Sequence, residues 1–262
     1  VDPNARNREA MLGQAAGFES ALNAFINNCL EISSCALTGD LENAQIQVID
    51  LLAKTAVTPL KSKSDREVTE GLVLLGIASA LYDSESGWPV LRDAFKEATL
   101  GSGTSFLTLA DQYAGREEDG SYLSNENDAL QVISCLDQNE LETVLMFKKG
   151  VAEFSDKAPI FGPYLAYAGL ACRYLPNLGS VEQIEIKSIN TKPILVVGTT
   201  RDPATPYKWA QSLAKIFSSA LLITLDGDGH AGHGRGSTCV DSAVDRYLLT
   251  GAMPKSELFC AR

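Results

Sequence analysis

Apolar positions recur at helical spacing through about the first 160 residues of the chain. Residues 7–32 (NREAMLGQAAGFESALNAFINNCLEI) repeat apolar side chains every three or four positions and contain no proline, which is typical of a helix. The same period is present, between short polar connectors, in residues 42–54, 64–83, 87–100 and 102–115. The pattern therefore predicts a helical region over residues 1–160.

Local signals refine the limits of these helices. Ser64 precedes Glu67 by three residues, which predicts a capping box at the start of the third helix. Pro89 stands near the start of the fourth, where its missing N–H costs little. Further along, residues 127–138 (NDALQVISCLDQ) predict a short extended piece, whereas residues 139–154 and 163–175 predict two more helices.

The pattern changes character from about residue 184. Residues 192–198 (KPILVVG) and 219–226 (SALLITLD) are short apolar runs, which predict buried strands. Thr205 and Pro206 fit the start of a helix over residues 206–217, and Gly251 fits the end of a last one. This order predicts an α/β segment over residues 161–262, with two parallel strands and flanking helices.

Both histidines of the chain, His230 and His233, lie in the glycine-rich segment LDGDGHAGHGRGSTC (225–239) that follows the second predicted strand. Asp202 follows the first strand, which we expect to end at Gly198. Because parallel strands end at the same edge of a sheet, Asp202 and His230 are expected to meet there. A carboxylate on one imidazole nitrogen leaves the other free to take a proton from a nucleophile. This pattern predicts His230 as a catalytic base and Asp202 as the catalytic carboxylate that orients it.

Two other interpretations of these loops stay open. His230 and His233 with nearby aspartates offer enough ligands for a metal, but their spacing is not that of a helical metal pair. The D-G-D-G run resembles a calcium loop, yet its twelfth position holds Ser237 where a glutamate is needed. We therefore expect no metal and no cofactor. In the second interpretation Asp202 is an ordinary turn residue, and Arg201 pairs with a nearby carboxylate.

Composition and charge exclude some classes of partner. The formal net charge of −11 disfavours nucleic-acid binding, because an acidic surface repels phosphates. The chain contains no run of about 18 apolar residues, so the sequence predicts no membrane span. The polar opening VDPNARNRE predicts that the chain itself carries no signal peptide.

The six cysteines fall into three local groups, which favours disulfides and export. Pairing nearest neighbours predicts Cys29–Cys35, Cys135–Cys172 and Cys239–Cys260. Six reduced thiols in a cytosolic protein are the alternative.

The last third of the chain resembles a known family. The succession of strand, GTTRDPATP, helix, strand, GDGHAGHGRGSTC, helix and terminal cysteine is similar to the end of an α/β-hydrolase. More narrowly, it resembles the C-terminal region of secreted bacterial tripeptidyl-aminopeptidase-like serine peptidases, which are relatives of proline iminopeptidase. The opening VDP and the stretches ISCLD and CRYLP resemble further parts of that family.

The resemblance implies a partial α/β-hydrolase fold, with a helical lid followed by the last two parallel strands and their flanking helices. It makes Asp202 the triad acid, His230 the triad base and His233 an accessory residue. It also implies a secreted or cell-envelope bacterial exopeptidase that releases short peptides from free N-termini. Asp137 is then a candidate for holding the substrate α-ammonium, with Glu117, Glu118 and Asp119 as alternatives or a plain surface role instead.

One part of the family pattern is missing. The chain has no G-x-S-x-G nucleophile elbow, which precedes the acid and the base in α/β-hydrolases. The resemblance therefore implies that the serine lies in an N-terminal half outside this chain, and that the chain alone is inactive. Two alternatives stay open: an esterase or lipase of the same fold, and a non-catalytic, disulfide-stabilised helical binding module.

Overall fold

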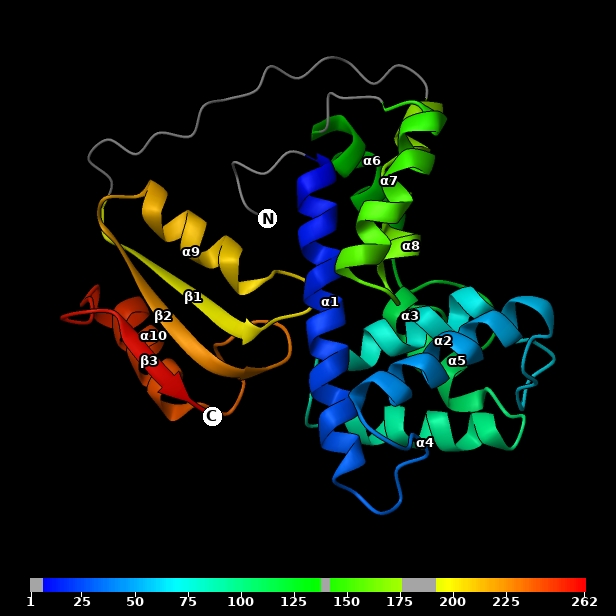
Figure 1. Ribbon diagram of the computed structural model, residues 1–262. Coiled ribbons are helices and arrows are strands. Elements are labelled where there is room, and N and C mark those ends of the chain that lie inside the picture. Colours follow the sequence, from blue (N-terminus) through cyan, green and yellow to red (C-terminus); the bar gives the residue numbers. More distant parts are fainter. Residues whose placement is uncertain (1–6, 138–141, 176–191) are drawn as a thin grey trace.

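The computed structural model describes residues 7–137, 142–175 and 192–262 (Figure 1). A helical part precedes a small sheet with two helices. The helical part comprises α1 (Asn7–Leu30), α2 (Leu41–Val57), α3 (Glu70–Leu81), α4 (Gly87–Thr99), α5 (Thr104–Ala114), α6 (Glu126–Asp137), α7 (Val144–Lys157), α8 (Gly162–Leu165) and the 3₁₀ helix η1 (Leu170–Tyr174). The second part comprises β1 (Ile194–Arg201), α9 (Tyr207–Ile216), β2 (Ala220–Asp228), α10 (Thr238–Thr250) and β3 (Leu258–Ala261).

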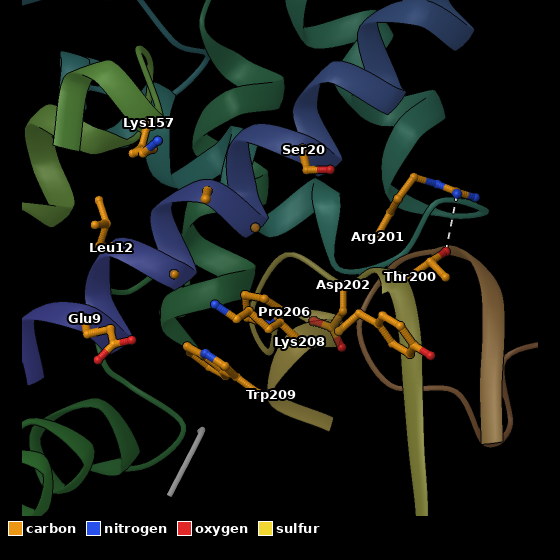
Figure 2. A pocket seen from close by; sticks show the side chains of 14 residues that line it. Glu9, Leu12, Ser20, Lys157, Thr200, Arg201, Asp202, Pro206, Lys208 and Trp209 are labelled. Atoms are coloured by element: carbon orange, nitrogen blue, oxygen red, sulfur yellow. Dashed lines mark hydrogen bonds between the residues drawn. The ribbon is translucent and has the colours of Figure 1, made fainter. Parts of the chain in front are cut away.

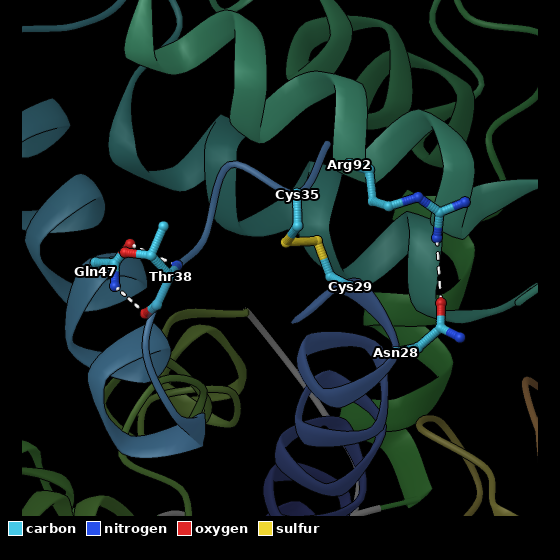
Figure 3. Close-up of a disulfide and its surroundings, with 6 residues drawn as sticks. All are labelled: Asn28, Cys29, Cys35, Thr38, Gln47 and Arg92. Carbon is cyan, nitrogen blue, oxygen red and sulfur yellow. Dashed lines mark hydrogen bonds between the residues drawn. A yellow bond between two sulfur atoms is a disulfide. The ribbon is translucent and has the colours of Figure 1, made fainter. Parts of the chain in front are cut away.

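Helix α1 runs between the sheet and the other helices (Figure 1). Its apolar face supplies Leu22, Phe25 and Ile26, which are fully buried in a core shared with α2 to α5. Burial of such a face stabilises a helix more than its intrinsic propensity does. The Cys29–Cys35 disulfide closes the turn after α1, as Figure 3 shows.

The start of α3 differs from the capping-box prediction. The helix begins at Glu70 with Thr69 at its N-cap, so Ser64 and Glu67 lie outside it. Leu60 and Val68 instead exchange both backbone hydrogen bonds in an antiparallel bridge, which holds the intervening residues in a turn. The Ser64 hydroxyl is used inside this turn, where it accepts a hydrogen bond from the Arg66 N–H and bonds the Ser62 hydroxyl, so it does not cap the helix.

Two predictions for residues 126–175 were wrong. The expected extended piece is the helix α6, whose apolar side chains at Leu130 and Ile133 lie three residues apart, as on one helical face. Residues 163–175 do not form one helix, because α8 and η1 are separate short turns on either side of Gly169. The predicted helix over residues 139–154 is α7, and its expected first residues lie outside the described ones.

The three strands form a parallel sheet in the order β1-β2-β3. The predicted parallel pair is present, and β3 adds a strand that the sequence pattern did not reveal. Helices α9 and α10 cover opposite faces: Gly198 and Thr224 lie beneath α9, whereas Ile223 and Leu225 pack against α10. Within the described residues, the outer edge of β1 has no partner strand.

Gly198 does not end β1, as expected from the sequence, but lies inside it. An added Cβ at this position would lie 2.6 Å from the Cβ of Ala210 in α9. The glycine therefore serves the close packing of helix on strand, and β1 continues to Arg201.

No helix in the described part of the chain is long and apolar enough to cross a membrane.

Candidate active site

Asp202 is the first residue after β1, and its carboxylate is almost completely buried. Oδ1 accepts hydrogen bonds from the backbone N–H groups of Ala204, at 2.9 Å, and Thr205, at 2.8 Å. The Thr205 hydroxyl donates to Oδ2 at 2.8 Å, and the Ala231 N–H donates to the same oxygen at 3.1 Å. Four donors besides any imidazole therefore hold the carboxylate in one orientation.

His230 lies two residues after β2, and its imidazole meets that carboxylate. Nδ1 lies 3.0 Å from Oδ1 and 3.0 Å from Oδ2 of Asp202. The side chain is one-third exposed. Within the residues that the structure describes, no group bonds Nε2, which leaves that nitrogen available for proton transfer.

Opposing effects set the protonation of Asp202. Burial raises the pKa of the carboxyl, because a charge is costly away from water. Hydrogen bonds from His230 and Thr205 stabilise the charged form and outweigh burial, so the pKa lies below its ordinary value. The carboxylate is therefore ionised at neutral pH.

Sequence reasoning missed the part that Thr205 plays here. We expected it to cap the helix, but α9 begins at Tyr207 with Pro206 at the N-cap, and the Thr205 hydroxyl turns to Asp202 instead. That hydroxyl also lies 3.4 Å from His230 Nδ1. The D-P-A-T spacing is the only local signal, because an Asp side chain often bonds the backbone two or three residues on.

Ala231 has a left-handed backbone, with φ of 67°. Its N–H bonds Asp202, and its carbonyl accepts from the Thr199 hydroxyl at 2.9 Å. Hydrogen bonds with Thr199 of β1 and with Asp202 thus hold this strained backbone in place. Strained residues of this kind are often found at functional sites.

Arg201 pairs with the aspartates at the end of β2. Its guanidinium lies 2.9 Å from Asp226 and 2.6 Å from Asp228, so the ion pair expected under the turn interpretation is present. Hydrogen bonds that Arg201 donates to the carboxylates of Asp228 and Asp226 raise the pKa of its guanidinium. Across residues 7–137, 142–175 and 192–262, no cluster of His, Cys, Asp and Glu is suited to hold a metal ion.

The other predicted site residues form no part of this pair. His233 Nε2 lies 2.9 Å from Asp245 at an exposed position, and His233 lines one cavity together with Asp202 and His230. Asp137 is the exposed last residue of α6, which lies well away from the carboxyl end of β1 (Figure 1).

Two cavities adjoin Asp202. One, of about 470 Å³, is lined by α1 and the β1–α9 loop, which also share a hydrogen bond from the Gln14 amide to the Ala204 carbonyl, and Figure 2 shows its lining side chains. The other, of about 340 Å³, is lined by β1, α9, Thr205, His230 and His233, so the imidazole borders an open space.

Three disulfides join the nearest-neighbour cysteines: Cys29–Cys35, Cys135–Cys172 and Cys239–Cys260. The Cys239–Cys260 disulfide joins the start of α10 to β3. It follows residues 229–237, the segment between β2 and α10 that we call the histidine loop. Such bonds fit an extracellular protein.

Comparison with known proteins identifies related hydrolases. Residues 158–260 match the α/β-hydrolase family model (Abhydrolase_4) that is described as TAP-like protein. The chain is 31% identical over 275 residues to serine protease Hip1 of Mycobacterium tuberculosis, covering 99% of this chain and 51% of that protein. Carboxylesterase B of the same species is 32% identical over 266 residues, covering 100% and 50%. Tripeptidyl aminopeptidase of Streptomyces coelicolor is 25% identical over 182 residues, covering 68% and 33%.

The chain thus spans about half the length of the first two relatives. These relatives carry the names of a serine protease and an esterase, so the relationship is to hydrolases. The parallel sheet, the Asp202–His230 pair and the family match lead to one assignment. Over residues 158–260, which the family model matches, the chain belongs to the TAP-like family of α/β-hydrolases.

Proposed function

We propose that this chain supplies the acid and base of a Ser-His-Asp triad in a serine exopeptidase that releases short peptides from free N-termini. The observation that carries the proposal is the position of His230 Nδ1, within 3.0 Å of both oxygens of the buried Asp202. That contact fixes the tautomer in which Nδ1 carries the proton and Nε2 accepts one.

The chemistry follows from this arrangement. Nε2 of His230 takes the proton of a serine hydroxyl as the oxygen attacks the carbonyl carbon of the substrate. The imidazolium that forms is stabilised by ionised Asp202, and it then gives the proton to the leaving amine. Water completes a second round, with His230 again as the base, and frees the acyl product.

The serine belongs, in this proposal, to a part of the protein outside these 262 residues. The chain lacks a G-x-S-x-G elbow, and the relatives named Hip1 and carboxylesterase B are about twice as long as this chain. The unpaired edge of β1 offers a place for a further parallel strand. The 340 Å³ cavity beside that edge and His230 then receives the nucleophile.

The substrate class rests on resemblance and on the names of relatives. The helical part serves as a lid that limits the site to short peptides. Asp137 remains a candidate partner of the substrate α-ammonium on the resemblance alone, because it lies away from the carboxyl end of β1. Three disulfides support secretion or a place in the bacterial cell envelope.

A fluorophosphonate probe tests the catalytic pair in the complete protein. We expect it to label a serine outside this chain, and labelling to disappear with His230→Ala. His233→Ala is the matched control, because within the described residues this second histidine lines the same cavity but bonds Asp245 rather than Asp202, and the variant is expected to label normally. Full labelling of the His230→Ala protein overturns the assignment.

An esterase is the second candidate, favoured by the relative named carboxylesterase B. Peptides with a blocked amino group separate the two, because an aminopeptidase requires the free amine. Cleavage of simple esters together with indifference to the amine identifies an esterase instead.

A further inference from the structure

Tyr82, the C-cap residue of α3, contacts His230 in two ways. Its backbone carbonyl accepts a hydrogen bond from the His230 N–H at 2.8 Å. Its ring centroid lies 5.2 Å from that of the imidazole, with an angle of 73° between the two planes. Edge-to-face contacts of this kind are attractive and favour one relative orientation of the rings.

The residues after Tyr82 continue along the histidine loop. Asp83 lies 3.4 Å from Arg235, and the Ser84 hydroxyl donates to the carbonyl of Asp228 at 3.3 Å. Exposed ion pairs contribute little to stability one by one, so we assign these contacts to alignment of the loop.

Gly229 permits this close approach. Its φ of 108° is open to glycine but strained for other residues, and an added Cβ would lie 3.0 Å from the carbonyl oxygen of Tyr82. The loop therefore has a glycine where it meets the end of α3.

The Tyr82 ring also packs against two aromatic side chains of the helical part. The ring lies 6.0 Å from Phe18 of α1 and 5.6 Å from Tyr113 of α5, between ring centroids. Phe18 is buried in the main helical core. The imidazole thus contacts a side chain that is fixed by two helices of the lid.

We propose that Tyr82 is a positioning residue for His230, through which the helical part orients the base. The backbone bond sets the position of the loop, and the ring limits rotation of the imidazole. Nδ1 then stays at Asp202 while Nε2 faces the nucleophile. This inference rests on the proposed function, and a displacement of about 1 Å at such a base costs on the order of a hundredfold in rate.

The test compares ring removal at two neighbouring tyrosines in the complete protein. Tyr82→Leu is expected to lower kcat by about tenfold to a hundredfold, with KM changed by less than about twofold. Tyr82→Phe keeps the ring and is expected to restore kcat to within about threefold of the unmodified protein. Tyr113→Leu removes a ring that packs against Tyr82 rather than against His230, and its kcat is expected to fall less than that of Tyr82→Leu.

Each outcome has a separate meaning. Normal kcat in Tyr82→Leu, or an equal loss in Tyr113→Leu, overturns the role of Tyr82. Should Tyr82→Leu fail to fold by circular dichroism, Tyr82→Met, whose flexible unbranched side chain adapts better to an irregular gap, replaces it under the same criteria. Persistence of probe labelling in His230→Ala overturns the proposed function itself, so the two failures are distinguishable.

Discussion

Nδ1 of His230 lies 3.0 Å from each carboxylate oxygen of Asp202, although 28 residues separate the two in sequence. Each residue follows the end of a parallel strand, and backbone or hydroxyl donors hold the carboxylate from other directions. The site therefore orients an imidazole before any substrate arrives.

Asp202→Asn tests whether the charge and the tautomer matter. An amide that offers N–H to Nδ1 favours the wrong tautomer, so kcat is expected to fall by about 10⁴-fold while the protein stays folded. Steady-state kinetics with a peptide substrate measures the loss. Asp245→Asn, which alters only the exposed pair with His233, is expected to leave kcat unchanged.

The stability of the protein is expected to depend on Asp202 at acid pH. Burial raises its pKa, but hydrogen bonds from His230 and Thr205 lower it further, so the folded pKa lies below the unfolded one. A depressed carboxyl pKa adds stability that is fully present above about pH 4 and is lost as pH falls through the folded pKa. Thermal unfolding against pH should therefore show the gap between the unmodified and Asp202→Asn proteins narrowing below about pH 4. A constant gap contradicts this prediction.

Thr205 offers a graded test of the acid. Thr205→Val keeps the shape but removes the hydroxyl that donates to Asp202, a bond to a charged group worth about 1.5–3 kcal/mol. We expect kcat to fall by about tenfold or more, and Thr205→Ser to retain most of it. Equal activity of the valine and serine variants shows that the hydroxyl has no part.

Gly198→Ala is expected to destabilise the sheet rather than the chemistry. The new methyl group would lie 2.6 Å from the Cβ of Ala210, and overpacking of this kind costs about 1–3 kcal/mol. Chemical denaturation measures the change. Gly71→Ala is the control, because nothing lies within 4 Å of its added Cβ in α3, and it is expected to be neutral or stabilising.

Removal of metal ions is expected to have no effect on activity or melting temperature. Arg201 already pairs with Asp226 and Asp228, the carboxylates that a calcium loop here would need. Treatment with EDTA followed by assay and thermal unfolding checks this point. A fall in activity that calcium or zinc restores revives the metal interpretation.

The sequence by itself determined most of the longer helices, the two longer strands and the order of the site residues, but not α6. Apolar runs at 192–198 and 219–226 identified two parallel strands, which placed Asp202 and His230 at the same edge. This works because the direction of consecutive parallel strands follows from chain order alone. The spacing of the cysteines likewise indicated the pairs that the structure forms.

Only the tertiary structure decided the features that depend on distant contacts. The four residues of β3 carry too little pattern to predict a strand, and they pair only because β2 presents an open edge. The Thr205 hydroxyl bonds the Asp202 carboxylate and does not cap α9, because that buried charge needs hydrogen-bond donors. Tyr82 meets His230 across nearly 150 residues of chain, since the end of α3 and the histidine loop converge in space. Periodicity describes a segment and its neighbours, whereas such contacts depend on how the segments pack together.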